Sequence, residues 1–232
     1  MIVQKINLYQ DQFKIKKLFI SAFNVIILLL IVLVIVGLLI GGVLKGQEMI
    51  TNAKLKRIES DNAGLAAAVF SYQDRYMQLP GDDNAADDRF DGFSAVGDGN
   101  GSIDGHWLVT TNALETGMFW MMLRASGLVS GDPTDSQRQQ NAYAGKIGIH
   151  SGGLGIGGHV TVFGRLEGSV VKILESRLDD GKPDEGRIRS ANFSPAIVDA
   201  EGASNVADIG STAADAVDEY TDLDLYDTVF RF

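Results

Sequence analysis

One uninterrupted apolar run constrains this chain more than any other feature. Residues 25–44 contain no charged or strongly polar side chain and read Val-Ile-Ile-Leu-Leu-Leu-Ile-Val-Leu-Val-Ile-Val-Gly-Leu-Leu-Ile-Gly-Gly-Val-Leu. About 20 residues of helix, at a rise of about 1.5 Å each, match the roughly 30 Å hydrocarbon layer of a bilayer. Lipid cannot hydrogen-bond the backbone, so the run predicts a transmembrane helix despite its β-branched residues. The alternative is a buried core helix, but such helices seldom lack polar residues over this length.

A basic segment precedes the apolar run. Residues 1–24 carry Lys5, Lys14, Lys16 and Lys17 against one acidic residue, Asp11. A positively charged segment before an apolar core is typical of a cytoplasmic leader. A cleaved secretory signal would share this charge, but its apolar region should be shorter and should end in a small-x-small site.

The helix is expected to continue beyond the apolar run and to become amphipathic. Apolar and small polar residues recur there at alternating spacings of three and four, as expected for one face of a helix. They are Leu55, Ile58, Asn62, Leu65, Val69, Tyr72 and Tyr76. The helix should end at Leu79-Pro80-Gly81-Asp82, because proline disfavours helix in the residue before it. One helix of about 55 residues is predicted, apolar all round over 25–50 and on one side only over 51–79.

Four glycines lie near the junction of these two halves. Gly37 with Gly41, and Gly42 with Gly46, form two small-xxx-small pairs. Such pairs allow close helix–helix approach in a membrane, although each glycine costs about 1 kcal/mol of helix stability relative to alanine. A helix–helix contact and a chance spacing both stay open at this point.

Two stretches of this helix resemble a known family. Residues 31–54 and 68–82, the latter ending Tyr76-Met-Gln-Leu-Pro-Gly-Asp82, resemble the N-terminal half of type IV pilins and type II secretion pseudopilins. Residues 119–129 and 178–186 are similar to segments of large pilin-like proteins of Gram-negative bacteria. The resemblance implies an α+β fold in which a long N-terminal helix packs on a small antiparallel sheet with short helices and long loops.

The resemblance also implies a function. The chain would be a structural subunit, not an enzyme, anchored in the bacterial inner membrane with residues 51–232 as a periplasmic domain. It would assemble into a type IV pilus or a secretion pseudopilus through its apolar helix. The implied partners are other pilin subunits, an assembly platform and an ATPase. Further expected features are the membrane itself and, because such proteins often stabilise loops with calcium, a calcium ion.

The chain departs from the family at its processing motif. In the family, a peptidase cleaves the chain after a glycine, and the mature chain then begins Phe-Thr-Leu-Ile-Glu. Alignment on Gly37 places Phe23 at the family's Gly, Asn24 at its Phe and Leu28 at its Glu. The family's intramembrane glutamate is costly alone and is relieved by pairing with a neighbouring subunit. Its replacement by Leu28 keeps an alternative open, a single-pass anchored periplasmic domain that does not polymerise.

A glycine-rich loop carries the candidate metal ligands. Asp98, Asn100, Ser102 and Asp104 alternate oxygen-bearing side chains in the manner of calcium loops. The EF-hand pattern requires glycine at its sixth place and glutamate at its twelfth, where this chain has Ile103 and Val109, so the match is partial. A solvated turn is the competing interpretation.

Composition excludes several other functions. The chain has no cysteine, which excludes disulfides, thiolate zinc sites and thiol catalysis. Its net charge of −10 argues against a nucleic-acid partner. The spacing Gly153-x-Gly155-x-x-Gly158 matches a dinucleotide fingerprint, but the alternating strand pattern that follows predicts a glycine-rich hairpin instead.

The remaining elements follow from local patterns. Helices are expected over 114–128 and 168–178, strands over 146–150 and 159–163, loop over 82–105 and 132–142, and a final strand over 187–190. His150 and His159 could share a metal across the hairpin, but surface histidines are the alternative. Acidic residues at 179–185 could bind a cation or simply face solvent. The acid-rich C-terminal segment should end in a short apolar stretch at 228–230 that docks on the sheet.

Overall fold

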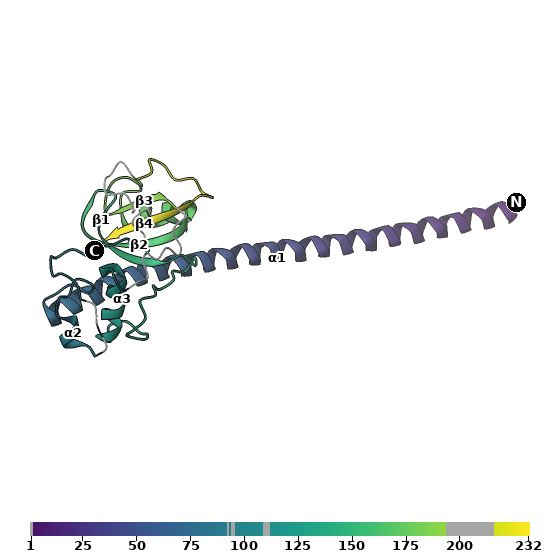
Figure 1. The fold of residues 1–232 in the computed structure, drawn as a ribbon. Helices are drawn as coiled ribbons and strands as arrows, with labels where there is room; N and C mark the ends of the chain where they lie inside the picture. Colours follow the sequence, from purple (N-terminus) through teal and green to yellow (C-terminus); the bar gives the residue numbers. More distant parts are fainter. Residues whose placement is uncertain (1, 92, 94–95, 109–111, 194–215) are drawn as a thin grey trace. The chain divides into compact units, whose positions relative to one another are not determined.

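The computed structural model describes residues 2–91, 93, 96–108, 112–193 and 216–232. Its elements are α1 Ile2–Tyr76, α2 Ala86–Arg89, α3 Glu115–Ala125, β1 Ile147–Gly153, β2 Ile156–Glu167, α4 Gly168–Leu178, β3 Ile188–Asn192 and β4 Leu225–Arg231 (Figure 1). The contacts divide the chain into two compact units, Met1–Ala53 and Lys54–Phe232, and α1 contributes to both. Helix α1 begins at Ile2, so the basic segment before the apolar run is helical too.

The four strands form one antiparallel sheet in the order β1-β2-β4-β3. The predicted α+β class, with a long N-terminal helix and a small antiparallel sheet, is confirmed. The strand expected over 187–190 exists as β3, but the expectation that it is the last strand is wrong. The last strand is β4, which lies between β2 and β3 and pairs Val162 with Val229 and Ser190 with Thr228. The prediction that residues 228–230 dock on the sheet is therefore confirmed.

The amphipathic stripe of α1 enters the core of the C-terminal unit. Leu55, Ile58, Leu65, Val69 and Tyr72 are buried in one cluster with residues of α3, α4 and the sheet. Apolar positions three and four apart share one helix face, so a single side of α1 supplies this surface. The other predicted positions, Asn62 and Tyr76, are half-buried at its margin. The helix ends at Tyr76, three residues before Leu79, and Met77 has φ of 56°.

The shorter elements follow the sequence closely. Helix α4 has the predicted bounds, and α3 lies within the predicted range with Phe119, Trp120, Met122 and Leu123 fully buried. The glycine-rich stretch forms the hairpin between β1 and β2, in which Gly153 pairs with Ile156. The loop predicted over 82–105 contains the four-residue helix α2, which the sequence did not indicate. The acid-rich residues 200–215 and Val109 lie outside the described residues.

The buried stripe gives a direct stability prediction. Ile58→Ala should lower the free energy of unfolding by about 2–5 kcal/mol, because Ile58 is 0% exposed and its loss leaves a cavity. Ile50→Ala is the matched control on the same helix, since Ile50 is 60% exposed and should change stability by less than about 0.5 kcal/mol. Thermal unfolding of the detergent-solubilised chain measures both. Equal losses in the two variants would contradict the assigned helix face.

Candidate functional site

The apolar half of α1 exposes its side chains on all sides. Among the described residues, one helix is long and apolar enough to cross a membrane, with its candidate span at Phe23–Tyr76, and none of its most apolar 18-residue window is buried. Leu33 is 70% exposed and Leu38 is 72% exposed. Exposed apolar patches beyond a few hundred Å² are rare on soluble monomers and mark membrane or protein contacts. This half of the helix is therefore a surface built for apolar surroundings.

The residues predicted to act in assembly lie on this exposed half. Leu28 is 62% exposed. A β-carbon added at Gly37, Gly41, Gly42 or Gly46 would meet no atom within 4 Å. Larger residues would thus fit at all four positions within one copy of the chain. Among the described residues, no contact explains these glycines. Small residues at this spacing would allow close approach of another helix.

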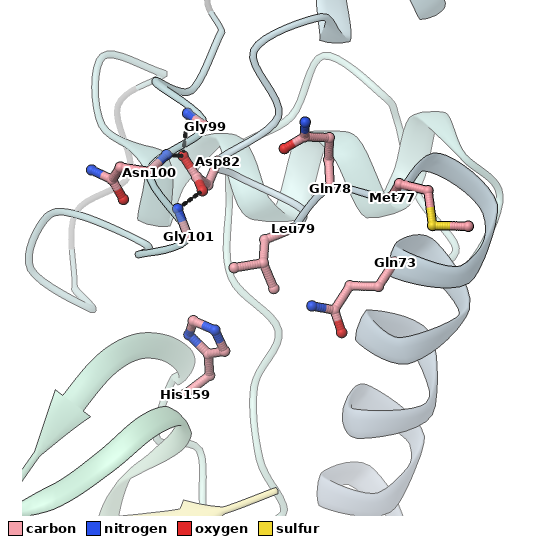
Figure 2. A pocket seen from close by; sticks show the side chains of 9 residues that line it. All are labelled: Gln73, Met77, Gln78, Leu79, Asp82, Gly99, Asn100, Gly101 and His159. Carbon is pink, nitrogen blue, oxygen red and sulfur yellow. Dashed lines mark hydrogen bonds between the residues drawn. The ribbon is translucent and has the colours of Figure 1, made fainter.

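The loop of the predicted metal ligands is held by hydrogen bonds from its backbone N–H groups to a buried carboxylate. Asp82 is fully buried, and its carboxylate accepts hydrogen bonds from the N–H groups of Gly99, Asn100 and Gly101 at 2.6, 3.1 and 2.7 Å (Figure 2). Asp98 Oδ1 accepts from the N–H of Asn100 at 3.0 Å. Successive N–H groups that converge on one carboxylate form an anion-binding nest. Asp82 is the internal anion that orders this loop.

The structure brings Asp98 together with two acidic residues that the sequence did not suggest. One carboxylate oxygen from each of Asp82, Asp98 and Glu115 lies within 4.8 Å of the others. Glu115 is buried and accepts from the N–H groups of Asp98 and Asp104 at 3.1 and 2.7 Å. Burial raises the pKa of Glu115, while these two hydrogen bonds oppose the shift. Asp104 does not join this carboxylate group.

The other two predicted ligands serve the turn itself. Asn100 Oδ1 accepts from the N–H of Ser102 at 2.7 Å, as in an Asx turn. Asp82 could have been anticipated from its place directly after the Leu79-Pro80-Gly81 helix end. Nothing in the sequence pattern links Glu115 to the loop, because the link is made by hydrogen bonds between segments 11 and 17 residues apart.

An open pocket of about 630 Å³ adjoins this loop. Gln73 and Met77 at the end of α1, Leu79 and Asp82 after it, and His159 of β2 line the pocket with Gln78 and residues 99–101 (Figure 2). His159 Nδ1 lies 3.0 Å from Ser151 Oγ. Burial lowers the pKa of His159, which favours the neutral ring.

The two histidines of the hairpin are engaged separately. His150 Nδ1 lies 2.8 Å from the carbonyl oxygen of Gly152, whereas His159 contacts Ser151. Among the residues that the structure describes, neither histidine lies with two further acidic or histidine side chains close enough to share a metal ion. Both histidines are half-buried, so they are less exposed than the surface histidines of the alternative interpretation.

A second carboxylate group lies at the C-terminal end of α4. One oxygen from each of Glu175, Asp179 and Asp180 lies within 4.8 Å of the others. Glu175 is 0% exposed, and Tyr220 donates its hydroxyl hydrogen to Glu175 Oε1 at 2.8 Å. Burial raises the pKa of Glu175 to about 8, against the opposing hydrogen bond from Tyr220, and the charges of Asp179 and Asp180 raise it further.

No family model and no curated protein matches this chain. Among solved structures, the chain is similar to the major type IV pilin PilA1 from Clostridium difficile, at 15% sequence identity and a TM-score of 0.33. The match covers 77% of this chain and 96% of that chain. The chain itself combines a long N-terminal helix with a four-stranded antiparallel sheet.

Glu175 should make the stability of the C-terminal unit depend on pH. Its folded pKa of about 8 lies above the ordinary glutamate pKa of 4.5, so the folded state holds a proton that the unfolded state releases first. This contribution is complete below about pH 4.5 and is lost as the pH rises through about 8. Relative to Glu175→Gln, the wild type should therefore lose about 2–4 kcal/mol of unfolding free energy between about pH 5 and about pH 8.

Thermal unfolding in metal-free buffer across this pH range measures the difference. Glu185→Gln is the control, because Glu185 is an exposed acid in the loop that follows α4. A constant difference between the wild type and Glu175→Gln at all pH values would contradict the raised pKa.

Proposed function

We propose that this protein is a membrane-anchored, filament-forming subunit of the pilin type, which assembles through the apolar half of α1. The observation that carries the proposal is the long apolar stretch of α1, whose most apolar part is not buried against any of the described residues. Burial of apolar surface contributes roughly 25 cal/mol per Å², so this helix is unstable in water without a partner. The partner is lipid before assembly and other copies of the helix afterwards.

The two environments make the same demands on the helix. An α-helix satisfies its backbone hydrogen bonds internally, so it passes from lipid to a helix bundle without leaving polar groups unpaired. Transfer between them exchanges one apolar surrounding for another, and van der Waals packing at small residues then decides which helices associate. The open faces at Gly37 and Gly41, and at Gly42 and Gly46, are the proposed contacts between copies.

The proposed setting is the bacterial inner membrane, with the acidic C-terminal unit in the periplasm. The basic segment before the apolar run supports a cytoplasmic N-terminus. Assembly of such a filament would require a membrane platform and an ATPase as partners. The chain would then serve in a type IV pilus or in a secretion pseudopilus.

A second candidate function is a single-pass anchored domain that does not polymerise. It is favoured by Phe23, Asn24 and Leu28, where the pilin family has the cleaved glycine, the methylated phenylalanine and the glutamate. Without that glutamate, a subunit lacks the charge that pairs with a neighbouring N-terminus. Membrane anchoring is common to both candidates, and only assembly separates them.

Calcium binding by Asp98, Asn100, Ser102 and Asp104 stays a prediction. The three-carboxylate group of Asp82, Asp98 and Glu115 supplies oxygen ligands of the kind that calcium prefers. The Asp82 carboxylate already accepts hydrogen bonds from the N–H groups of Gly99 and Gly101, so the loop has an internal partner besides any calcium ion.

Two substitutions at one glycine test assembly. Gly41→Leu should reduce cross-linking between copies at least about tenfold, because a large side chain blocks close helix approach. Gly41→Ala is the matched control. Like Gly41→Leu, it raises helix propensity, by about 1 kcal/mol, but its side chain is small enough to allow close helix approach. Both side chains fit within one copy, because nothing lies within 4 Å of a β-carbon at Gly41.

The readout is disulfide cross-linking in membranes through a single cysteine introduced at Ile40, which is unique because the chain has none of its own. Equal cross-linking in Gly41→Leu and the wild type would rule out this face as the contact.

Mass spectrometry of the protein extracted from membranes separates the two candidate functions. A processed pilin would lack about 23 residues and carry an added methyl group, whereas the anchored domain would keep Met1. The substitution Leu28→Glu restores the missing carboxylate. If the native chain is the anchored form, filaments should form only in the Leu28→Glu variant. The Leu28→Gln variant should form none, because pairing with a neighbouring N-terminus requires charge. Filaments of an unprocessed wild-type chain would contradict this division.

A further inference from the structure

Three carboxyl groups lie together at the C-terminal end of α4, where negative charge destabilises a helix. The group consists of Glu175 in the last turn, Asp179 as the C-cap and Asp180 directly after it. The carbonyl groups at a helix C-terminus carry a partial negative charge, so cations stabilise this end and anions destabilise it. Two nearby bases also contact acids outside the group, Arg177 with Glu59 at 4.0 Å and Lys182 with Glu185 at 2.7 Å.

One oxygen of this group is buried and lacks a partner. Glu175 is 0% exposed, and its Oε2 accepts no hydrogen bond from any residue that the structure describes. Its other oxygen accepts from Tyr220, whose hydroxyl also lies 3.0 Å from Ser190 Oγ. A buried carboxylate oxygen without a donor is costly, and a proton, a cation or an ordered water removes that cost. The contrast with Asp82, whose oxygens accept three N–H groups, singles out Glu175.

The loop after α4 fixes the second carboxylate of the group. Asp179 Oδ2 accepts from the N–H groups of Arg187 and Ile188, the latter at 2.7 Å. Gly186 has φ of +74°, and a β-carbon there would lie 2.2 Å from Asp179 Oδ2. The loop therefore closes tightly on Asp179 and holds it near Glu175, while Asp180 is exposed and reachable from solvent.

We propose that Glu175, Asp179 and Asp180 bind a hard divalent cation of the calcium class. The three ligands are all carboxylates, which calcium accepts in irregular arrangements of six to eight oxygens. Softer metals prefer sulfur or imidazole, and neither cysteine nor histidine takes part in this group. A bound cation gives the buried oxygen of Glu175 a partner and offsets the negative end of α4. The site is separate from the loop at Asp98.

Ion counting on the full-length chain in detergent tests the proposal, with calcium as the probe. Asp180→Asn should bind one calcium ion fewer per chain than the wild type in equilibrium dialysis at millimolar calcium. It should also lose part or all of the rise in melting temperature that calcium gives the wild type. Asp74→Asn is the matched control, since Asp74 is an exposed acid on α1, and it should bind as many ions as the wild type.

A second variant guards against misfolding. Glu175→Gln keeps the side-chain shape and an acceptor for Tyr220, so it should fold at least as well as the wild type without calcium and should also bind one ion fewer. Asp98→Asn reports on the other loop, so a site there is counted independently. The proposal is overturned if the wild type, Asp180→Asn and Glu175→Gln bind the same number of calcium ions. It is also overturned if Asp98→Asn alone abolishes all the calcium binding of the wild type.

Discussion

The rest of this structure depends on the exposed apolar surface of α1, which the described part of the chain does not cover. That surface must be buried against something outside the chain. Over residues 25–44 the side chains of α1 are apolar and exposed on every side. Beyond Lys54 the same helix is apolar on one face only, and that face carries the core of the C-terminal unit. The first half needs lipid or other helices, and the second half is satisfied within the chain. One element thus joins a surface for assembly to a folded domain.

The sequence predicted the parts of the fold that depend on local periodicity. The stripe from Leu55 to Tyr72 repeats at the helical spacing, and α4 has the predicted bounds because its apolar residues share one face. The central position of β4 was not predictable in this way. It depends on pairing between Val162 and Val229, which are far apart in the chain, and local patterns do not encode such pairing. The acid-rich segment before it gave no sign that the chain returns to the middle of the sheet.

The candidate metal sites show the same division. Alternating polar residues identified the loop at Asp98, but its companions Asp82 and Glu115 come from other segments and are brought in by backbone hydrogen bonds. At the end of α4, the acidic residues 179–185 were visible in the sequence, whereas the burial of Glu175 was not. Asp82 and Glu175 are both buried, yet their surroundings differ in a way that the sequence does not indicate. Asp82 is surrounded by N–H donors, and Glu175 has one oxygen without any among the described residues.

The central claim is that residues 25–44 occupy an apolar surrounding in the working protein. A nitroxide spin label on a single cysteine at Leu38, introduced into the otherwise cysteine-free chain, measures this in native membranes. If these residues face lipid, dissolved oxygen, which concentrates in lipid, should relax the label at Leu38 more than a water-soluble nickel complex does. The reverse order is expected for a label at Asp74. Greater access of the nickel complex than of oxygen at Leu38 would contradict the account.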